Sequence, residues 1–219
     1  MDNSSIDMSF FRPVRCELNF LSRPDGSAIF SLGDTIFLSA VYGPVEVKLQ
    51  KVQIDRATIE AVYRPISGIS GVGDRLKENL IKNTCETALM AALFPRTSIN
   101  IIIQNMQDSG GGLACAVNAA CAALIYSGLP IKFLFAASAC MLSEDDKIIT
   151  DPDSKQLETA KGSFTFVFDS ASYSVIASHT EGKFSDKDYQ QALIRCKVGA
   201  DQLFTYYRHL ARKYKPVPS

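Results

Sequence analysis

Short runs of alternating apolar and polar residues dominate the first third of the chain, a pattern typical of half-buried β-strands. Turn signals separate these runs. Pro24-Asp25-Gly26 joins a proline that presets φ to a permissive glycine, and Leu32-Gly33-Asp34 makes a second tight connection. The pattern predicts two consecutive hairpins followed by one more strand. The predicted strands cover residues 15–20, 27–31, 35–42 and 58–63.

After the glycine-rich segment 68–73, the apolar spacing changes to a helical period. Apolar residues between positions 75 and 93 fall on one face of a helix, which predicts a long amphipathic helix there. Phe94-Pro95 ends this helix, because proline disfavours helical geometry in the residue before it. The β-branched residues at 98–104 then predict an interior strand.

The second half of the chain alternates helices with strands. The turn Asp108–Gly112 opens a helix of small residues, which can pack closely against a sheet. The order of elements favours an α/β fold of the α+β type, with one two-layer domain, mixed sheets and long packing helices. We expect that domain to span residues 1–219, with flexible ends at 1–11 and 214–219. The predicted helices are 113–126 and about 185–214, and the predicted strands are 131–141, 164–168 and 173–178.

Charge and hydropathy indicate whether nucleic acid or a membrane is an expected partner. Lysine plus arginine number 23, and aspartate plus glutamate also number 23, so no net charge attracts nucleic acid from a distance. Any RNA contact must come from a local patch or from neighbouring subunits. No run approaches the ~20 apolar residues that span a bilayer, and residues 1–11 lack a signal-peptide pattern. No membrane partner is therefore expected.

The six cysteines do not form a recognisable metal or disulfide pattern. They include no Cys-x-x-Cys pair, and only His179 and His209 can join them, so we expect no metal and no cofactor. Their apolar surroundings, as in residues 113–124, predict buried small side chains in the reducing cell interior. No nucleophile-base arrangement can be built around His179, and we assign it no catalytic role.

Several short motifs carry a family resemblance by their order and spacing. They are Arg23–Ser27, Gly33–Thr35, Phe94–Ser98, Asp108–Gly111 and, later, Asp151–Ser154. Together they resemble the RNase PH family and, within it, the subunits that form the ring of the eukaryotic RNA exosome. The resemblance covers nearly the whole chain and implies the RNase PH-like fold.

The resemblance also implies an active-site pattern. Active members remove 3′-terminal nucleotides from RNA by phosphorolysis, with inorganic phosphate as the attacking group. A glycine-rich turn at a helix start offers N–H groups to that phosphate, and Gly110 and Gly111 match it as a phosphate-binding remnant. An arginine belongs where Gly112 stands. Asp151 matches the first of two aspartates, but the second position is Leu157, which can neither donate a proton nor coordinate a cation.

These departures imply a noncatalytic structural subunit of the exosome ring, which is not itself an enzyme. The implied partners are other RNase PH-like exosome subunits, cap proteins and the RNA that passes through the ring. The implied location is the nucleus and nucleolus, and also the cytoplasm. Two alternatives remain open. One is an active exoribonuclease, phosphorolytic or metal-dependent and hydrolytic, that uses Asp151, Asp153 or Glu158; the other is a homodimeric nucleic-acid-binding cofactor of another nuclease.

Basic residues near the long helix are candidate weak RNA contacts. Arg96 matches a family position near the central RNA path, while Arg75 and Lys77 flank the helix start. Ordinary surface charges at helix ends explain the same residues, and for Arg75 and Lys77 we prefer that explanation. Family members join sheet edges in pairs, so the segment 35–48 is one candidate for pairing, and a homodimer is expected when the chain is isolated.

Overall fold

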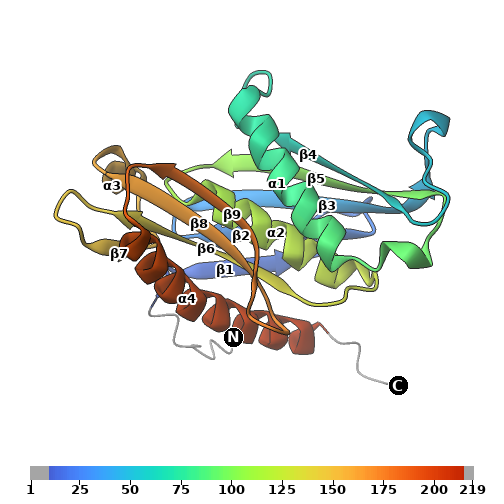
Figure 1. The fold of residues 1–219 in the computed structure, drawn as a ribbon. Coiled ribbons are helices and arrows are strands. Elements are labelled where there is room, and N and C mark those ends of the chain that lie inside the picture. Colours follow the sequence, from blue (N-terminus) through green and yellow to red (C-terminus); the bar gives the residue numbers. More distant parts are fainter. Residues whose placement is uncertain (1–9, 215–219) are drawn as a thin grey trace.

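Two β-sheets and four α-helices make up the fold in the computed structural model, which describes residues 10–214 (Figure 1). The first sheet is mixed, since β4 runs parallel to β5 while the other neighbours are antiparallel. The predicted α+β class with mixed sheets is confirmed. In spatial order the first sheet contains β1 (Val14–Leu18), β2 (Gly26–Leu32), β3 (Thr35–Glu46), β5 (Thr97–Gln107) and β4 (Thr58–Arg64).

The second sheet is antiparallel throughout. Its order is β7 (Ile148–Thr150), β6 (Phe135–Leu142), β8 (Gly162–Asp169) and β9 (Val175–Gly182). The α-helices are α1 (Val72–Ala88), α2 (Gly112–Ser127), α3 (Ser154–Glu158) and α4 (Asp186–Lys213), and the 3-10 turns are η1 (Leu49–Lys51) and η2 (Ala91–Leu93).

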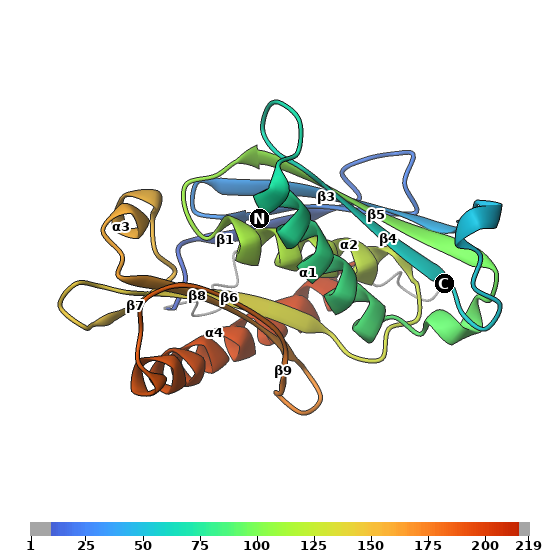
Figure 2. The same cartoon turned by 45° about the horizontal axis from the view of Figure 1, so that its top comes forward.

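Helix α2 lies between the two sheets and contacts β2 and β3 on one side and β6 on the other (Figures 1 and 2). Its small residues allow this close approach. A Cβ on Gly26 of β2 would lie 2.6 Å from the Ser127 Cβ, so only glycine fits where the sheet meets the helix. The Asn118 side chain, fully buried in α2, exchanges two hydrogen bonds with the backbone of Ala137 in β6. The helix therefore joins the sheets by both packing and hydrogen bonds.

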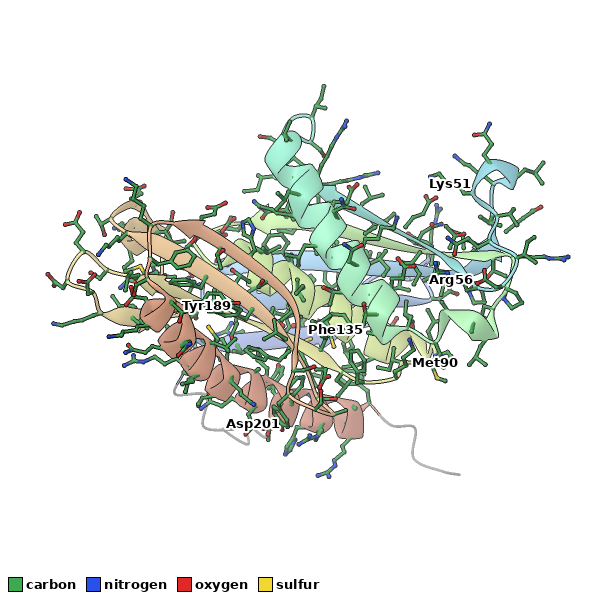
Figure 3. All side chains as sticks on the ribbon, in the orientation of Figure 1. Lys51, Arg56, Met90, Phe135, Tyr189 and Asp201 are labelled. Atoms are coloured by element: carbon green, nitrogen blue, oxygen red, sulfur yellow. The ribbon has the colours of Figure 1, made fainter. Side chains whose placement is uncertain are left out.

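Helix α4 covers the other face of the second sheet and contacts β6 and β8 (Figure 1). Its buried stripe includes Leu203, Phe204 and Tyr207. The Ser185 hydroxyl accepts from the Asp188 N–H, which caps the first turn of the helix. Figure 3 shows the labelled Asp201 on the outer side of α4. No helix within residues 10–214 is both long and apolar enough to cross a membrane.

The long amphipathic helix ends earlier than the sequence predicts. We expected it to continue to residue 93, but α1 stops at Ala88. Leu89 adopts extended geometry and forms a β-bridge with Ile131, and the Lys132 N–H donates to the Ala88 carbonyl. These tertiary hydrogen bonds replace the last turn, which local apolar spacing could not reveal.

Two further expectations need correction. Within segment 35–48, residues 35–41 are not a free sheet edge, because β2 pairs with them on one side and β5 pairs with β3 on the other. Phe10 and Phe11, predicted within a flexible end, instead pack into the fold. The Phe10 ring lies against Gly199 of α4, where an added Cβ would be 2.5 Å from a ring carbon, and Phe11 is 9% exposed. Residues 1–9 and 215–219, the rest of those ends, lie outside the described residues.

The cysteines behave as the sequence predicts. Cys16 is half-buried, and the other five free thiols are buried. Burial raises the pKa of the Cys121 thiol to about 12, which disfavours the reactive thiolate. The prediction of buried small apolar side chains is confirmed.

Candidate functional site

A cavity of about 460 Å³ opens where the start of α2 faces α3 and the strands β8 and β9. The structure brings Gly110, Gly111, Gly112 and Leu157 together in its wall, as the predicted site requires. Asp151 lies beside them, 7% exposed, and does not line the cavity. The predicted site positions therefore lie together at one place in the fold.

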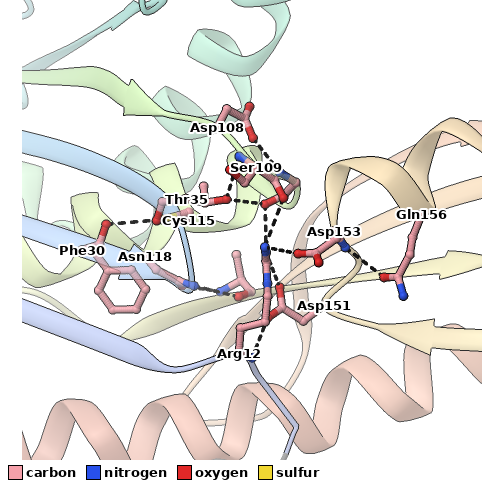
Figure 4. A network of polar contacts seen from close by, with 12 residues as sticks. Arg12, Phe30, Thr35, Asp108, Ser109, Cys115, Asn118, Asp151, Asp153 and Gln156 are labelled. Carbon is pink, nitrogen blue, oxygen red and sulfur yellow. Dashed lines mark hydrogen bonds and ion pairs between the residues drawn. The ribbon is translucent and has the colours of Figure 1, made fainter.

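Arg12 lies at the centre of a network of polar contacts beside this cavity, and no motif in the sequence predicted that role (Figure 4). Its Nε donates to Asp151 Oδ2 at 3.0 Å and its Nη2 to Asp151 Oδ1 at 3.0 Å. Its Nη1 donates to Asp153 Oδ1 at 2.7 Å and to the Ser109 carbonyl at 3.1 Å. Nη2 also donates to the Gly110 carbonyl at 2.9 Å.

These contacts use every N–H that a guanidinium has. A guanidinium carries five N–H donors, and Arg12 places all five on oxygen atoms of this chain. Both oxygens of Asp151 are also occupied, since the Arg12 backbone N–H donates to Oδ2 at 2.8 Å. The pair joins the start of the chain to a segment 139 residues away. Arg12 and Asp151 thus form a structural clamp.

The glycine-rich turn is held by this chain's own groups. The Gly110 N–H donates to Asp108 Oδ1 at 3.1 Å, and the Gly110 carbonyl accepts from Thr35 and Arg12. Gly111 has φ +68° and forms the N-cap of α2. One N–H that a phosphate would need is therefore already engaged by a carboxylate.

Replacing Gly110 with alanine should destabilise the fold strongly. The residue has φ +103°, and an added Cβ would lie 2.6 Å from the Ser154 nitrogen and 2.7 Å from the Asp153 carbonyl carbon. Gly128 is a matched control, because it also has positive φ but nothing within 4 Å of its Cβ position. We expect Gly110→Ala to cost about 2 kcal/mol more than Gly128→Ala in urea unfolding. Equal costs would show that the turn yields easily.

The arginine that the family resemblance implies at position 112 has no substitute in the first turn of α2. An added Cβ on Gly112 would collide with Asp108 Oδ2, so Asp108 occupies the space that a side chain there would enter. The next residue, Leu113, also lines the cavity and carries no charge. The helix start therefore presents no cationic side chain to the cavity.

Leu157 sits in the short helix α3 and lines the cavity with its apolar side chain. The two neighbouring carboxylates considered as substitutes point elsewhere. Asp153 caps α3 and pairs with Arg12, and Glu158 is exposed and does not line the cavity. Within residues 10–214 no cluster of metal-ligating side chains forms.

The three candidate RNA contacts lie at different places. Lys77 lines the cavity, and its Nζ lies 5.5 Å from the centroid of the Tyr63 ring. Arg75 is exposed on α1 and does not line the cavity. Arg96 is exposed beyond the other end of α1, where its N–H donates to the Gln53 carbonyl. The structure thus separates Arg96 from the cavity and brings only Lys77 to it.

Sequence reasoning missed Arg12 and the role of Asp108, and it considered His179 without placing it or Glu181 at the cavity. The last two side chains line the cavity from β9, with Nε2 and Oε1 3.1 Å apart. Asp108 belongs to the motif Asp108–Gly111, but only the three-dimensional turn shows that its carboxylate lies against Gly112. Nothing in the spacing along the chain connects Arg12 with Asp151.

Two domain models of one family match this chain. Domain 1 of the 3′ exoribonuclease family matches residues 10–130, and domain 2 matches residues 133–194. The chain therefore belongs to the 3′ exoribonuclease, or RNase PH, family, and the resemblance predicted from its motifs is confirmed.

Within that family, the chain is similar to exosome proteins. The chain is 36% identical, over 90% of both sequences, to the Exosome complex exonuclease RRP46 homolog of Arabidopsis thaliana. It is 30% identical to the Exosome complex component RRP46 homolog of Caenorhabditis elegans, over 92% of this chain and 94% of that one. The crystal structure of rice (Oryza sativa) Rrp46 superimposes with a TM-score of 0.88 and 32% identity, covering 92% of this chain and 95% of that one.

Proposed function

We propose that this chain is a noncatalytic subunit of an RNA exosome ring, supporting 3′-to-5′ RNA processing and decay by holding partners and shaping the RNA path. One observation carries the proposal. The cavity keeps the glycine-rich turn beside Asp151, but Gly112 and Leu157 stand where phosphorolysis requires an arginine and a second aspartate. The names of the plant and nematode relatives support membership of an exosome complex.

The two missing groups have a large combined effect on rate. A guanidinium gives phosphate a charged, forked set of donors, and its loss costs roughly 2–4 kcal/mol of transition-state stabilisation. That energy corresponds to about a hundredfold in rate, and loss of an acid or metal ligand lowers the rate further. A scaffold needs neither group, so a folded cavity without them suits a structural role.

Arg12 cannot take over the lost phosphate contact. Its five N–H groups are already bonded, so binding phosphate would require breaking contacts to Asp151 or Asp153. Breaking them would leave the buried carboxylate of Asp151 without its cation. The contacts of Arg12 therefore support a role for Asp151 in stabilising the fold and not in catalysis.

The partners of the proposal are other RNase PH-like subunits, cap proteins and the RNA that passes through the ring. The test is to isolate the tagged full chain from its own cells and identify the co-purifying proteins. We expect several RNase PH-like chains in near-equal amounts, from nuclear, nucleolar and cytoplasmic fractions. Recovery of the chain without any such subunit would contradict the proposal.

A second candidate function is nuclease activity of this cavity, and Lys77 is the observation that favours it. Within residues 10–214, Lys77 is the only lysine or arginine that lines this cavity. The name of the Arabidopsis relative also includes the word exonuclease. If the cavity is a nuclease site, the pure chain shortens RNA and Lys77→Ala lowers the rate of shortening. Lys82→Ala, a change of a half-buried lysine on the same helix, should leave that rate unchanged. Dependence on phosphate or on a divalent metal would then separate phosphorolysis from hydrolysis.

A further inference from the structure

Two cysteines that are far apart in the sequence meet between α4 and the second sheet. Cys140 belongs to β6 and Cys196, 56 positions later, belongs to α4, and their Sγ atoms lie 2.8 Å apart. Cys196 is fully buried, and Cys140 is 1% exposed. Both thiols are free. Among the six cysteines, all of which the structure describes, no other two sulfur atoms are in hydrogen-bond contact.

The backbone is fixed on both sides of this thiol pair. Cys140 lies in a strand that has neighbours on both sides, β7 and β8. On the helix, the Cys196 carbonyl accepts from the Ser138 hydroxyl at 2.7 Å. The adjacent Arg195 donates from Nη1 to the Ile148 carbonyl at 2.8 Å. These bonds hold α4 against β6 and β7, so the two sulfur atoms remain neighbours whenever the helix is packed.

We propose that Cys140 and Cys196 are a site of reversible disulfide formation, with a peroxide as the oxidant, which goes beyond the proposed function. One thiol loses its proton, and its thiolate attacks a peroxide oxygen. The O–O bond breaks, the cysteine becomes a sulfenic acid, and the departing hydroxide takes up the proton as water. The second thiol then attacks the sulfenic sulfur, which forms the S–S bond and releases another water. Two thiols are oxidised, and one hydrogen peroxide is reduced to two waters.

The reduced pair is protected in the packed protein. The contact with the Cys196 thiol and burial both raise the pKa of the Cys140 thiol, so little of the reactive thiolate is present. Oxidation therefore begins when α4 opens locally from the sheet, and it ends when the helix repacks and returns the sulfur atoms to each other. In a reducing environment the pair stays a dithiol, and a peroxide converts it into a covalent link between α4 and β6.

Cys16 provides the contrasting case within the same chain. It is half-buried and is the most exposed of the six thiols, but no second sulfur is in hydrogen-bond contact with it. Peroxide should reach it more easily and leave a sulfenic acid that has no neighbouring thiol to condense with. The proposed disulfide therefore depends on the neighbouring sulfur and not on exposure.

Peptide mapping of the pure full chain tests the proposal. The reduced protein is treated with hydrogen peroxide, the remaining thiols are blocked with iodoacetamide in urea, and a digest without reductant identifies linked peptides. We expect one disulfide within the chain, between Cys140 and Cys196. It should be absent from Cys196→Ala and present in Cys121→Ala, the matched change of another buried cysteine.

Urea unfolding is the second measurement. The bond between Cys140 and Cys196 closes a long loop, which constrains the unfolded chain. We expect the urea midpoint of the oxidised wild type to lie about 1–2 M above that of the reduced wild type, and dithiothreitol to reverse the shift. Cys196→Ala should have the same midpoint before and after peroxide.

The mapping of the wild type decides the proposal even if Cys196→Ala does not fold. Reaction of both Cys140 and Cys196 with iodoacetamide after peroxide treatment would overturn it. A bond that joins either of them to a different cysteine would also overturn it, and so would a bonded wild type whose urea midpoint does not rise.

Discussion

Arg12→Ala should lower the free energy of unfolding by about 3–5 kcal/mol, because it removes one partner of a buried ion pair. The Asp151 side chain is 3% exposed and loses the two hydrogen bonds that the Arg12 guanidinium donates, while the Arg12 backbone N–H, which alanine also has, donates the third. The carbonyls of Ser109 and Gly110 also lose a donor. Urea unfolding followed by circular dichroism measures this loss.

Two variants make that measurement specific. Arg15→Ala removes an exposed arginine from the neighbouring strand and should change stability by no more than about 0.5 kcal/mol. Arg12→Lys keeps the charge but has three donors in place of five. The free energy of unfolding that it loses should therefore lie between the losses of Arg12→Ala and Arg15→Ala. A loss below about 1 kcal/mol for Arg12→Ala would show that the clamp is not structural.

Asn118→Ala should cost about 2–4 kcal/mol, the second large effect that the structure predicts. Asn118 Nδ2 donates to the Ala137 carbonyl at 2.9 Å, and Oδ1 accepts from the Ala137 N–H at 2.8 Å. Alanine leaves both backbone groups without this partner in the interior between α2 and β6.

The matched control for that change is Asn79→Ala on the exposed face of α1, which should stay within about 0.5 kcal/mol of the wild type. Thermal unfolding of both variants provides the comparison. If Asn118→Ala were as mild as the control, α2 would not be fixed to β6 by these hydrogen bonds.

Local patterns predicted most of the elements because the physical signals for them are local. Alternation identified β2 and β3, and the small-residue run after Asp108 identified α2, whose buried face meets both sheets. The end of α1 was wrong, because the bridge between Leu89 and Ile131 is a tertiary contact. Propensity and spacing carry no information about such a pairing.

The candidate site also contains residues that the sequence predicted and residues that only the fold reveals. Gly110, Gly111, Gly112 and Leu157 were predicted from motif positions and do share one cavity. The Arg12 clamp could not be predicted, because its partners lie 97 to 141 residues away along the chain. Lys77 was interpreted as an ordinary surface charge, yet the fold turns it toward the cavity. The family resemblance therefore predicted which site positions are replaced, and the structure identified the side chains that surround them.

The most direct test of the proposed noncatalytic role is the release of nucleoside diphosphates from RNA by the pure full chain in the presence of inorganic phosphate. We predict no release above that of a blank preparation purified in the same way, and no difference between the wild type and Asp151→Asn. Phosphate-dependent release that co-purifies with the folded wild type and is lost in folded Asp151→Asn would contradict the account.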